Sequence, residues 1–232
     1  FEKGFFGLNL TVPHKEIAFG LITSIDSAAV EIGAVNTLKR GPDGYYGYNT
    51  DGYGLSKGIE EDLSASLAGS DIAILGAGGA ARAAAVQALQ SDCQSLCIVN
   101  RSADRLENLL GSLQPIAREK GIPVKGFSAQ DTSLEFADHT LIINATSLGL
   151  NSSDPLPIPE DRLPQTAAHY DMIYNPRTTK LMKTVSDRGG RSANGLSMLV
   201  YQGLRALEIW SDRKIDPRNM KQAASSALAS KA

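Results

Sequence analysis

The segment 71–105 constrains the fold more than any other part of this chain, because it places a glycine-rich turn between two apolar runs. The first run is Ile72–Leu75, and the turn sequence GAGGAAR follows it directly. Alanine-rich sequence that favours a helix continues to Leu89, and the second apolar run is Leu96–Val99. This order of strand, turn, helix and strand predicts the βαβ unit of a dinucleotide-binding fold.

The glycine turn has the chemistry of a phosphate-binding site. Gly76 permits the tight turn at the end of the strand, and Gly78 lets a pyrophosphate approach the backbone. Ala81 is the small residue where the helix and the strand pack closely. The first N–H groups of the helix point at the phosphates, and the positive end of the helix dipole assists them. A sharp turn without a ligand is the alternative, and the flanking strand and helix favour the binding site over it.

The end of the second strand predicts NADP rather than NAD as the cofactor. An NAD-binding unit usually has an Asp or Glu about 20 residues after the turn, where it binds the ribose 2′-hydroxyl. This chain has Asn100 there, followed by Arg101 and Arg105. Two guanidinium groups can hold a 2′-phosphate by bidentate hydrogen bonds. The alternative is that both arginines lie on the solvated start of a helix.

Length and composition indicate an ordinary globular chain. Its 232 residues suffice for one large or two small domains, and a net charge of −2 gives no sign of a nucleic-acid surface. No apolar run approaches the ~20 residues of a membrane span, and no signal peptide is visible. The two cysteines form no disulfide framework, and the three histidines lack metal-ligand spacing, so we predict no metal site. We expect a cytoplasmic protein, and the start at Phe1 suggests that the natural start is missing.

The first fifty residues place polar side chains where predicted strands end. Residues 5–10 predict a strand, and residues 15–23 predict a helix after the break at Pro13. Thr11 and Lys15 therefore lie where the strand passes into the helix, a common location for site residues. A cation at a helix start is disfavoured by the helix dipole, which favours a functional role for Lys15 over a solvated surface position.

A predicted hairpin follows, and it also carries candidate residues. Residues 35–38 and 45–48 flank a Gly-Pro-Asp-Gly turn. Asn36 lies inside the first predicted strand, where asparagine is disfavoured. Asp51 follows the second strand, and it either caps the helix that begins near Tyr53 or belongs to a functional site.

Hydrophobic periodicity in the rest of the chain predicts alternating helices and strands. The predicted helices are 53–63, 104–120, 196–207 and 219–229, with Pro115 kinking or ending the second of them. The predicted strands are 140–144 and 170–174, separated by a loop, 151–164, that could cover a cofactor. This alternation implies an α/β fold with a doubly wound parallel sheet. Its strand ends should rim one crevice, at Gly76, Asn100, Ala145 and Tyr174.

Several motifs taken together resemble the shikimate dehydrogenase family. The first three are Asn9–Lys15, Gly33–Thr37 and Asn49–Gly52, in this order and ahead of the glycine turn. Three later segments agree with the family as well, namely Asn144–Gly149, Asp171–Pro176 and Asn194–Gln202. The match spans nearly the whole chain, and the combination is more specific than any single motif.

The resemblance implies two α/β domains, a substrate domain and a Rossmann-like NADP-binding domain, with the site in the cleft between them. It places the substrate domain at 1–50, the NADP-binding domain at 51–194 and the returning helices of the substrate domain at 195–232. We expect the family's amino-terminal part, which carries two serines for the substrate carboxylate, to be missing here. The implied activity is reversible, NADP-linked oxidation of shikimate to 3-dehydroshikimate, a step of chorismate and aromatic amino-acid biosynthesis.

The resemblance also implies roles for individual residues. Lys15 is expected to transfer the proton, with Asp51 beside it as the second catalytic residue. The implied substrate-binding residues are Thr11, Lys15, Asn36, Asp51, Tyr174 and Gln202. The implied pyrophosphate-binding residues are Gly76, Ala77, Gly78, Gly79 and Ala80. The implied contacts of the adenosine end are Asn100, Arg101, Ser102 and Arg105, and those near the nicotinamide are Thr146, Met172 and Gly195.

Three alternatives stay open at this point. The first is a quinate or dual quinate/shikimate dehydrogenase, since the two substrate rings differ by one hydroxyl. The second is an unrelated NADP enzyme that shares only the glycine turn, and the third is a non-catalytic NADP-binding or sensing protein. In each case we expect a small-molecule ligand, no nucleic-acid or membrane partner, and a monomer or homodimer.

Overall fold

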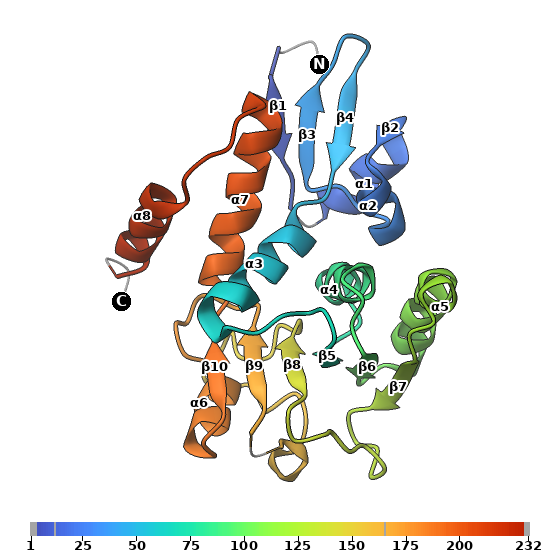
Figure 1. The fold of residues 1–232 in the computed structure, drawn as a ribbon, viewed down its shortest axis with the longest axis vertical. Coiled ribbons are helices and arrows are strands. Elements are labelled where there is room, and N and C mark those ends of the chain that lie inside the picture. The colour runs from blue at the N-terminus through green and yellow to red at the C-terminus, as the bar shows by residue number, and fades with distance from the viewer. Residues whose placement is uncertain (1–3, 12, 165, 230–232) are drawn as a thin grey trace.

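The computed structural model describes residues 4–11, 13–164 and 166–229, which form two β-sheets with helices around and between them (Figure 1). The chain passes from the smaller sheet to the larger one through helix α3 (Asp51–Leu63). It returns through helix α7 (Leu196–Ser211), and α3 and α7 pack along each other. This helix pair therefore joins the two sheets.

The smaller sheet has four strands in the order β1-β3-β4-β2. Its strands are β1 (Gly7–Asn9), β2 (Ser24–Ile25), β3 (Thr37–Arg40) and β4 (Tyr45–Tyr48), and its helices are α1 (His14–Leu21) and α2 (Ser27–Ile32). Strand β3 pairs antiparallel with both β1 and β4, whereas β2 pairs parallel with β4. The core here is small, and its buried members are Ala29, Val35 and Leu38.

The larger sheet has six strands, all parallel, in the order β10-β9-β8-β5-β6-β7. The strands are β5 (Asp71–Leu75), β6 (Ser95–Asn100), β7 (Val124–Ser128), β8 (Leu141–Asn144), β9 (Ala168–Asp171) and β10 (Arg191–Ala193). Its helices are α4 (Gly79–Gln90), α5 (Ala103–Lys120) and α6 (Lys180–Asp187). The strand order reverses between β5 and β8, and in doubly wound sheets such a reversal opens a crevice at the strand ends.

Both faces of the larger sheet are buried, as a parallel sheet requires. Successive residues of a strand point to opposite faces, so Ile72 and Ile74 enter one core while Ala73 and Leu75 enter the other. The first core contains α4 and α5. The second is completed by α6 and by residues of the connections before and after β8, namely Leu134, Phe136, Leu156, Ile158 and Leu163. The continuous apolar sequence of β5 therefore reflects burial on two sides.

The predicted fold class and the predicted βαβ unit are confirmed. Strand β5, helix α4 and strand β6 occupy the predicted segments, and the sheet is parallel and doubly wound. The hairpin is also confirmed, with Gly41 N–H donating to the carbonyl of Gly44 over 2.7 Å. Helix α8 (Arg218–Ala229) matches its prediction to one residue, and residues 230–232, which follow the predicted helix, lie outside the described residues.

Several predicted boundaries are wrong. Asn36 precedes strand β3, because its side chain forms the corner between the hairpin and α3. Tyr174 lies three residues beyond β9, because Asp171 turns the chain by accepting the N–H of Ile173 over 3.0 Å. The range predicted for helix α5, 104–120, is by contrast confirmed to one residue, and the helix does not end at Pro115.

Five short elements were missed by the periodicity argument, namely α2, α6, β2, β7 and β10. Each has between two and eight residues, which is too short for a clear periodic pattern. Among the described residues, no helix combines the length and the apolar character needed to cross a membrane.

Candidate active site

Helices α1 and α3 bring a lysine and a carboxylate together. Lys15 is the second residue of α1, and its Nζ donates to Oδ2 of Asp51 over 2.7 Å. Asp51 is the first residue of α3, where the positive end of the helix dipole favours a carboxylate. It does not cap the helix, since Thr50 occupies the N-cap position. The side chains of Lys15 and Asp51 remain 25% and 15% exposed, so a ligand can reach the ion pair.

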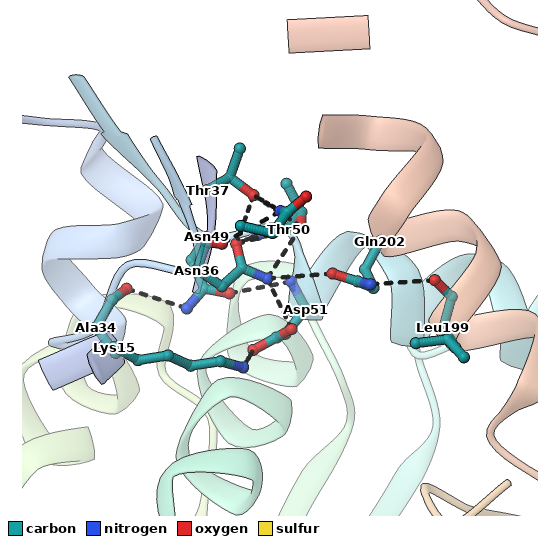
Figure 2. A network of polar contacts seen from close by, with 10 residues as sticks. Lys15, Ala34, Asn36, Thr37, Asn49, Thr50, Asp51, Leu199 and Gln202 are labelled. Atoms are coloured by element: carbon teal, nitrogen blue, oxygen red, sulfur yellow. Dashed lines mark hydrogen bonds and ion pairs between the residues drawn. The ribbon is translucent and has the colours of Figure 1, made fainter. Parts of the chain in front are cut away.

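Asn36 holds the carboxylate of Asp51 from the protein interior (Figure 2). Its Nδ2 donates to Oδ1 of Asp51 over 2.8 Å and to Oγ1 of Thr50 over 3.0 Å. Its Oδ1 accepts from the N–H of Thr50 and from the hydroxyl of Thr37, both over 2.9 Å. Asn36 is only 2% exposed, so this amide orients Asp51. Its expected contact with a substrate hydroxyl stays a prediction.

Helix α7 approaches this network from the other side. Oε1 of Gln202 lies 3.5 Å from Nδ2 of Asn36, and Nε2 of Gln202 donates to the carbonyl of Leu199 over 3.2 Å (Figure 2). The approach depends on Gly54 of α3, where an added Cβ would lie 2.6 Å from the carbonyl oxygen of Met198. A larger residue at position 54 would push α3 and α7 apart, and with them Asp51 and Gln202.

Most of the residues predicted to contact substrate line one pocket of about 460 Å³. It brings together residues from β1, α1, α3, α7 and the end of β9, which are far apart in the sequence. The predicted members are Thr11, Lys15, Asp51, Met172, Tyr174, Gly195 and Gln202. The pocket also contains residues that the sequence analysis did not select, namely Asn9, Leu10, Met198 and Leu199. Polar hydrogen-bonding groups thus lie beside an apolar wall, as in many small-molecule sites.

The glycine turn has the geometry that a phosphate group needs. Gly76 has φ +114°, and an added Cβ would lie 3.1 Å from the carbonyl oxygen of Ala145, which directly follows the neighbouring strand β8. Helix α4 begins at Gly79 without an acidic residue in its first turn and without a side-chain cap on its N–H groups. The residues present therefore fit the pyrophosphate of a dinucleotide, since open N–H groups and the helix dipole both attract an anion.

The glycine turn and the Lys15–Asp51 pair face a common space. A pocket of about 480 Å³ is lined by Lys15 and Asp51 on one side and by Gly79 and Ala80 on the other. The turn that follows the carboxyl end of β5 therefore opens toward the ion pair. A cofactor bound at the turn would extend toward the substrate pocket.

The residues predicted to contact the adenosine end of the cofactor are only partly brought together. Nδ2 of Asn100 donates to the carbonyl of Ser102 over 2.9 Å, and Oγ of Ser102 caps α5 by accepting the N–H of Arg105 at 3.5 Å. Arg105 lines a pocket of about 520 Å³ beside the glycine turn. Arg101 is exposed and does not line that pocket.

A second polar network lies at the ends of β8 and β9, and its central residues Asn144, Asp171 and Thr179 are buried. Asp171 at the end of β9 accepts from Nδ2 of Asn144 at 3.1 Å and from the hydroxyl of Thr179 at 2.7 Å. Oδ1 of Asn144 in turn accepts the hydroxyl of Thr146 at 2.8 Å. Burial raises the pKa of Asp171, against the lowering effect of these donors. The hydroxyl of Thr146 therefore belongs to a network that shapes the 144–149 loop.

Sequence reasoning missed this second network, although Asn144, Thr146 and Asp171 stand in segments that carried the family resemblance. Asp171 and Asn144 are polar residues at the ends of apolar strands, a signal that could have identified them. Among the described residues, no group of three or more His, Cys, Asp and Glu is placed to hold a metal ion. Burial raises the pKa of Cys93 to about 11 and that of Cys97 to about 12, which disfavours thiolate chemistry at either.

Comparison with known proteins places the chain in a family. The model of the shikimate dehydrogenase substrate binding domain matches residues 1–38, and that of the shikimate 5′-dehydrogenase C-terminal domain matches residues 195–224. The NADP(+) shikimate dehydrogenase of Geobacter metallireducens is 37% identical over 225 residues, which cover 97% of this chain and 79% of that protein. The chain belongs to the shikimate dehydrogenase family.

Solved structures of shikimate dehydrogenases and of a related reductase have the same fold. A shikimate dehydrogenase in complex with NADP+ has a TM-score of 0.85 and 33% identity, covering 98% of this chain and 78% of that one. The 5-ketofructose reductase of Gluconobacter sp. strain CHM43 also has a TM-score of 0.85, with 31% identity over 97% of this chain and 80% of that one. The resemblance inferred from the sequence motifs is thus confirmed, and the fold by itself is compatible with more than one substrate.

Proposed function

We propose that this chain is an NADP-dependent shikimate dehydrogenase, an oxidoreductase acting on a CH–OH group. It interconverts shikimate and 3-dehydroshikimate in the biosynthesis of chorismate and the aromatic amino acids. The observation that carries the proposal is the pocket in which Lys15 and Asp51, bonded over 2.7 Å, face Gly79 and Ala80 of the glycine turn. A proton donor and a dinucleotide site thus open into one space.

The chemistry at Lys15 follows from its position. The cofactor held at the glycine turn would provide the hydride for the carbonyl carbon, and the carbonyl oxygen would then require a proton. Lys15 lines the substrate pocket, and Asp51 orients its Nζ. This nitrogen therefore supplies the proton as a general acid. In the oxidative direction the same nitrogen accepts the hydroxyl proton. Asp51, itself held by Asn36, keeps the lysine in place and accepts a hydrogen bond from a ring hydroxyl.

The remaining predicted residues are assigned to binding. We propose that Thr11, Asn36, Tyr174 and Gln202 contact the substrate ring, and that Met172, Gly195 and the Thr146 loop lie beside the nicotinamide. The N–H groups at 76–80 take the pyrophosphate, and Asn100, Arg101, Ser102 and Arg105 take the adenosine end. The proposal also keeps the predicted domains, with the substrate domain at 1–50 and 195–232 and the NADP-binding domain at 51–194. It further includes a cytoplasmic location and a monomeric or homodimeric state.

Three other functions compete with this proposal. A quinate or dual quinate/shikimate dehydrogenase differs in one ring hydroxyl, which a single pocket residue can decide. A 5-ketofructose reductase is the activity named for one structural relative. A cofactor-sensing protein would bind NADPH without turnover, but the intact Lys15–Asp51 pair favours catalysis.

The decisive experiment measures NADP reduction by absorbance with shikimate, and then with quinate, together with NADPH oxidation by 3-dehydroshikimate and by 5-ketofructose. We expect turnover with shikimate and 3-dehydroshikimate, and a higher kcat/KM with NADP than with NAD. Turnover restricted to quinate or to 5-ketofructose would reassign the substrate. NADPH binding without any turnover would support the sensing protein.

A further inference from the structure

A pocket beside the glycine turn contains an arginine to which no role has been assigned. This pocket, of about 520 Å³, is lined by the turn, by the first two turns of α5 and by one residue of α1. Its lining residues are Glu16, Ala77, Gly78, Gly79, Arg82, Arg105, Asn108 and Leu109. Arg82 is the last residue of the turn sequence GAGGAAR and lies one turn into helix α4.

The guanidinium of Arg82 has no partner within the described residues. Its Nε is buried and makes no hydrogen bond, and the side chain forms no ion pair. An added Cβ on Gly33, which ends α2, would lie 3.1 Å from Nη2 of Arg82. The side chain therefore reaches from α4 toward the smaller sheet and lies against the end of α2. Buried donors of charged groups are normally paired, so an unpaired guanidinium at a pocket indicates an absent ligand.

The charges of this pocket favour an anion. Arg82 and Arg105 contribute two positive charges, and Glu16 of α1 contributes one negative charge. The open N–H groups and the positive dipole end of α4 add to the positive potential. A guanidinium binds phosphate by two parallel hydrogen bonds, so it matches the geometry of two phosphate oxygens better than an ammonium group would.

We propose that Arg82 is a cofactor-binding residue whose guanidinium, with Arg105 and the amino-terminal N–H groups of α4, holds a phosphate of NADP. The inference rests on the proposed function, since it takes the dinucleotide as the ligand. It shifts part of the phosphate binding from the exposed Arg101 to a residue whose side chain already lies in the pocket. The pyrophosphate and the 2′-phosphate share this chemistry, and cofactors with and without the 2′-phosphate distinguish them.

The test is equilibrium titration of the purified chain with NADPH and with NADH, followed by nicotinamide fluorescence. Arg82→Met removes the charge and keeps an unbranched side chain, and we expect the Kd for NADPH to rise about 10- to 100-fold. An equal rise for NADH assigns the contact to the pyrophosphate, whereas a rise for NADPH alone assigns it to the 2′-phosphate. Arg118→Met is the matched control, because Arg118 is an exposed arginine on α5 outside this pocket.

An unchanged Kd for NADPH in Arg82→Met, or an equal rise in Arg118→Met, would overturn the inference. If Arg82→Met does not fold, Arg82→Lys takes its place. That variant keeps the charge but loses the bidentate geometry, and unchanged binding would again contradict the proposal. Wild-type binding of NADPH without turnover of shikimate would refute the proposed function and leave the role of Arg82 standing. Absence of NADPH binding in the wild type would refute both.

Discussion

Two polar networks border the cleft, and they differ in how far solvent reaches them. The network of Lys15, Asp51 and Asn36 ends in an ion pair whose side chains are 25% and 15% exposed. The network of Asp171, Asn144 and Thr179 contains a carboxylate that is 0% exposed and has no cationic partner in the part of the chain that the structure describes. The first can exchange a proton with a ligand, whereas the second can only hold the backbone in place.

The difference shows how one fold separates residues that orient a reactive group from residues that hold the backbone in place. In the exposed network Lys15 and Asn36 both donate to the carboxylate of Asp51, so Asn36 orients Asp51 and Asp51 orients a single lysine. In the buried network Asp171 accepts from a side chain of β8, a side chain at the start of α6 and the N–H of Ile173. Substitutions in the first network should change turnover, and substitutions in the second should change stability.

The largest expected effect is on turnover, in Lys15→Ala. Loss of a general acid or base typically lowers a rate by about 10²- to 10⁴-fold, which corresponds to about 3–5 kcal/mol. We expect kcat to fall by this amount while the KM for shikimate changes much less. Steady-state kinetics with NADP and shikimate measure both quantities, and equal changes in kcat and KM would make Lys15 a binding residue.

Lys57→Ala is the control for this variant. Lys57 also forms an ion pair, with Glu60 over 2.6 Å, but both side chains are more than 40% exposed on the surface of α3. Surface pairs contribute about 0–1 kcal/mol, so neither turnover nor stability should change appreciably. A loss of turnover in Lys57→Ala would break the comparison, because it would tie activity to any ion pair in this region.

The next largest effect is on stability, in Asp171→Asn. The new amide replaces a carboxylate oxygen that accepts from Thr179 or Asn144, so buried donors are left unpaired. We expect the free energy of unfolding to fall by about 2–3 kcal/mol. Urea denaturation followed by circular dichroism measures the change. Asp187→Asn, at an exposed carboxyl at the end of α6, is the control. Equal stability of the two variants would contradict the assignment of Asp171 as a structural support.

The smallest effect concerns acid stability and His169. This residue is buried in β9, between Ile142 of β8 and Ser192 of β10, and neither ring nitrogen has a hydrogen-bond partner within the described residues. Burial lowers the pKa of His169 to about 3. The folded state keeps the imidazole neutral, while the unfolded chain binds a proton below about pH 6.5. The stability linked to the neutral His169 is therefore fully present above about pH 6.5 and is lost as the pH falls toward 3.

His169→Leu should remove this dependence. At about 1.4 kcal/mol per pH unit below about pH 6.5, the wild type should lose about 2 kcal/mol more than the variant between pH 7 and pH 5. Urea denaturation of both proteins at the two pH values measures the difference. An identical loss in both proteins would show that His169 finds a partner or water in solution.

The sequence by itself determined the βαβ unit, the parallel sheet and the family. These follow from local patterns, namely the glycine turn between two apolar runs and the order of short motifs. Such patterns can be recognised without knowing which segments contact each other in the folded chain. Lys15 and Asp51 were selected as candidates from a cation at a helix start and a carboxylate after a strand, and the family resemblance supplied the roles predicted for them.

Only the tertiary structure decided which residues work together. Asn36 was placed inside a strand, but it lies at a corner where it orients Asp51. Asp171 and Arg82 were not selected, because their roles depend on partners, or on the lack of them, that are distant in the sequence. Burial and hydrogen bonding are properties of the packed chain, so an asparagine, a carboxylate or an arginine has no assigned role until its neighbours in space are known.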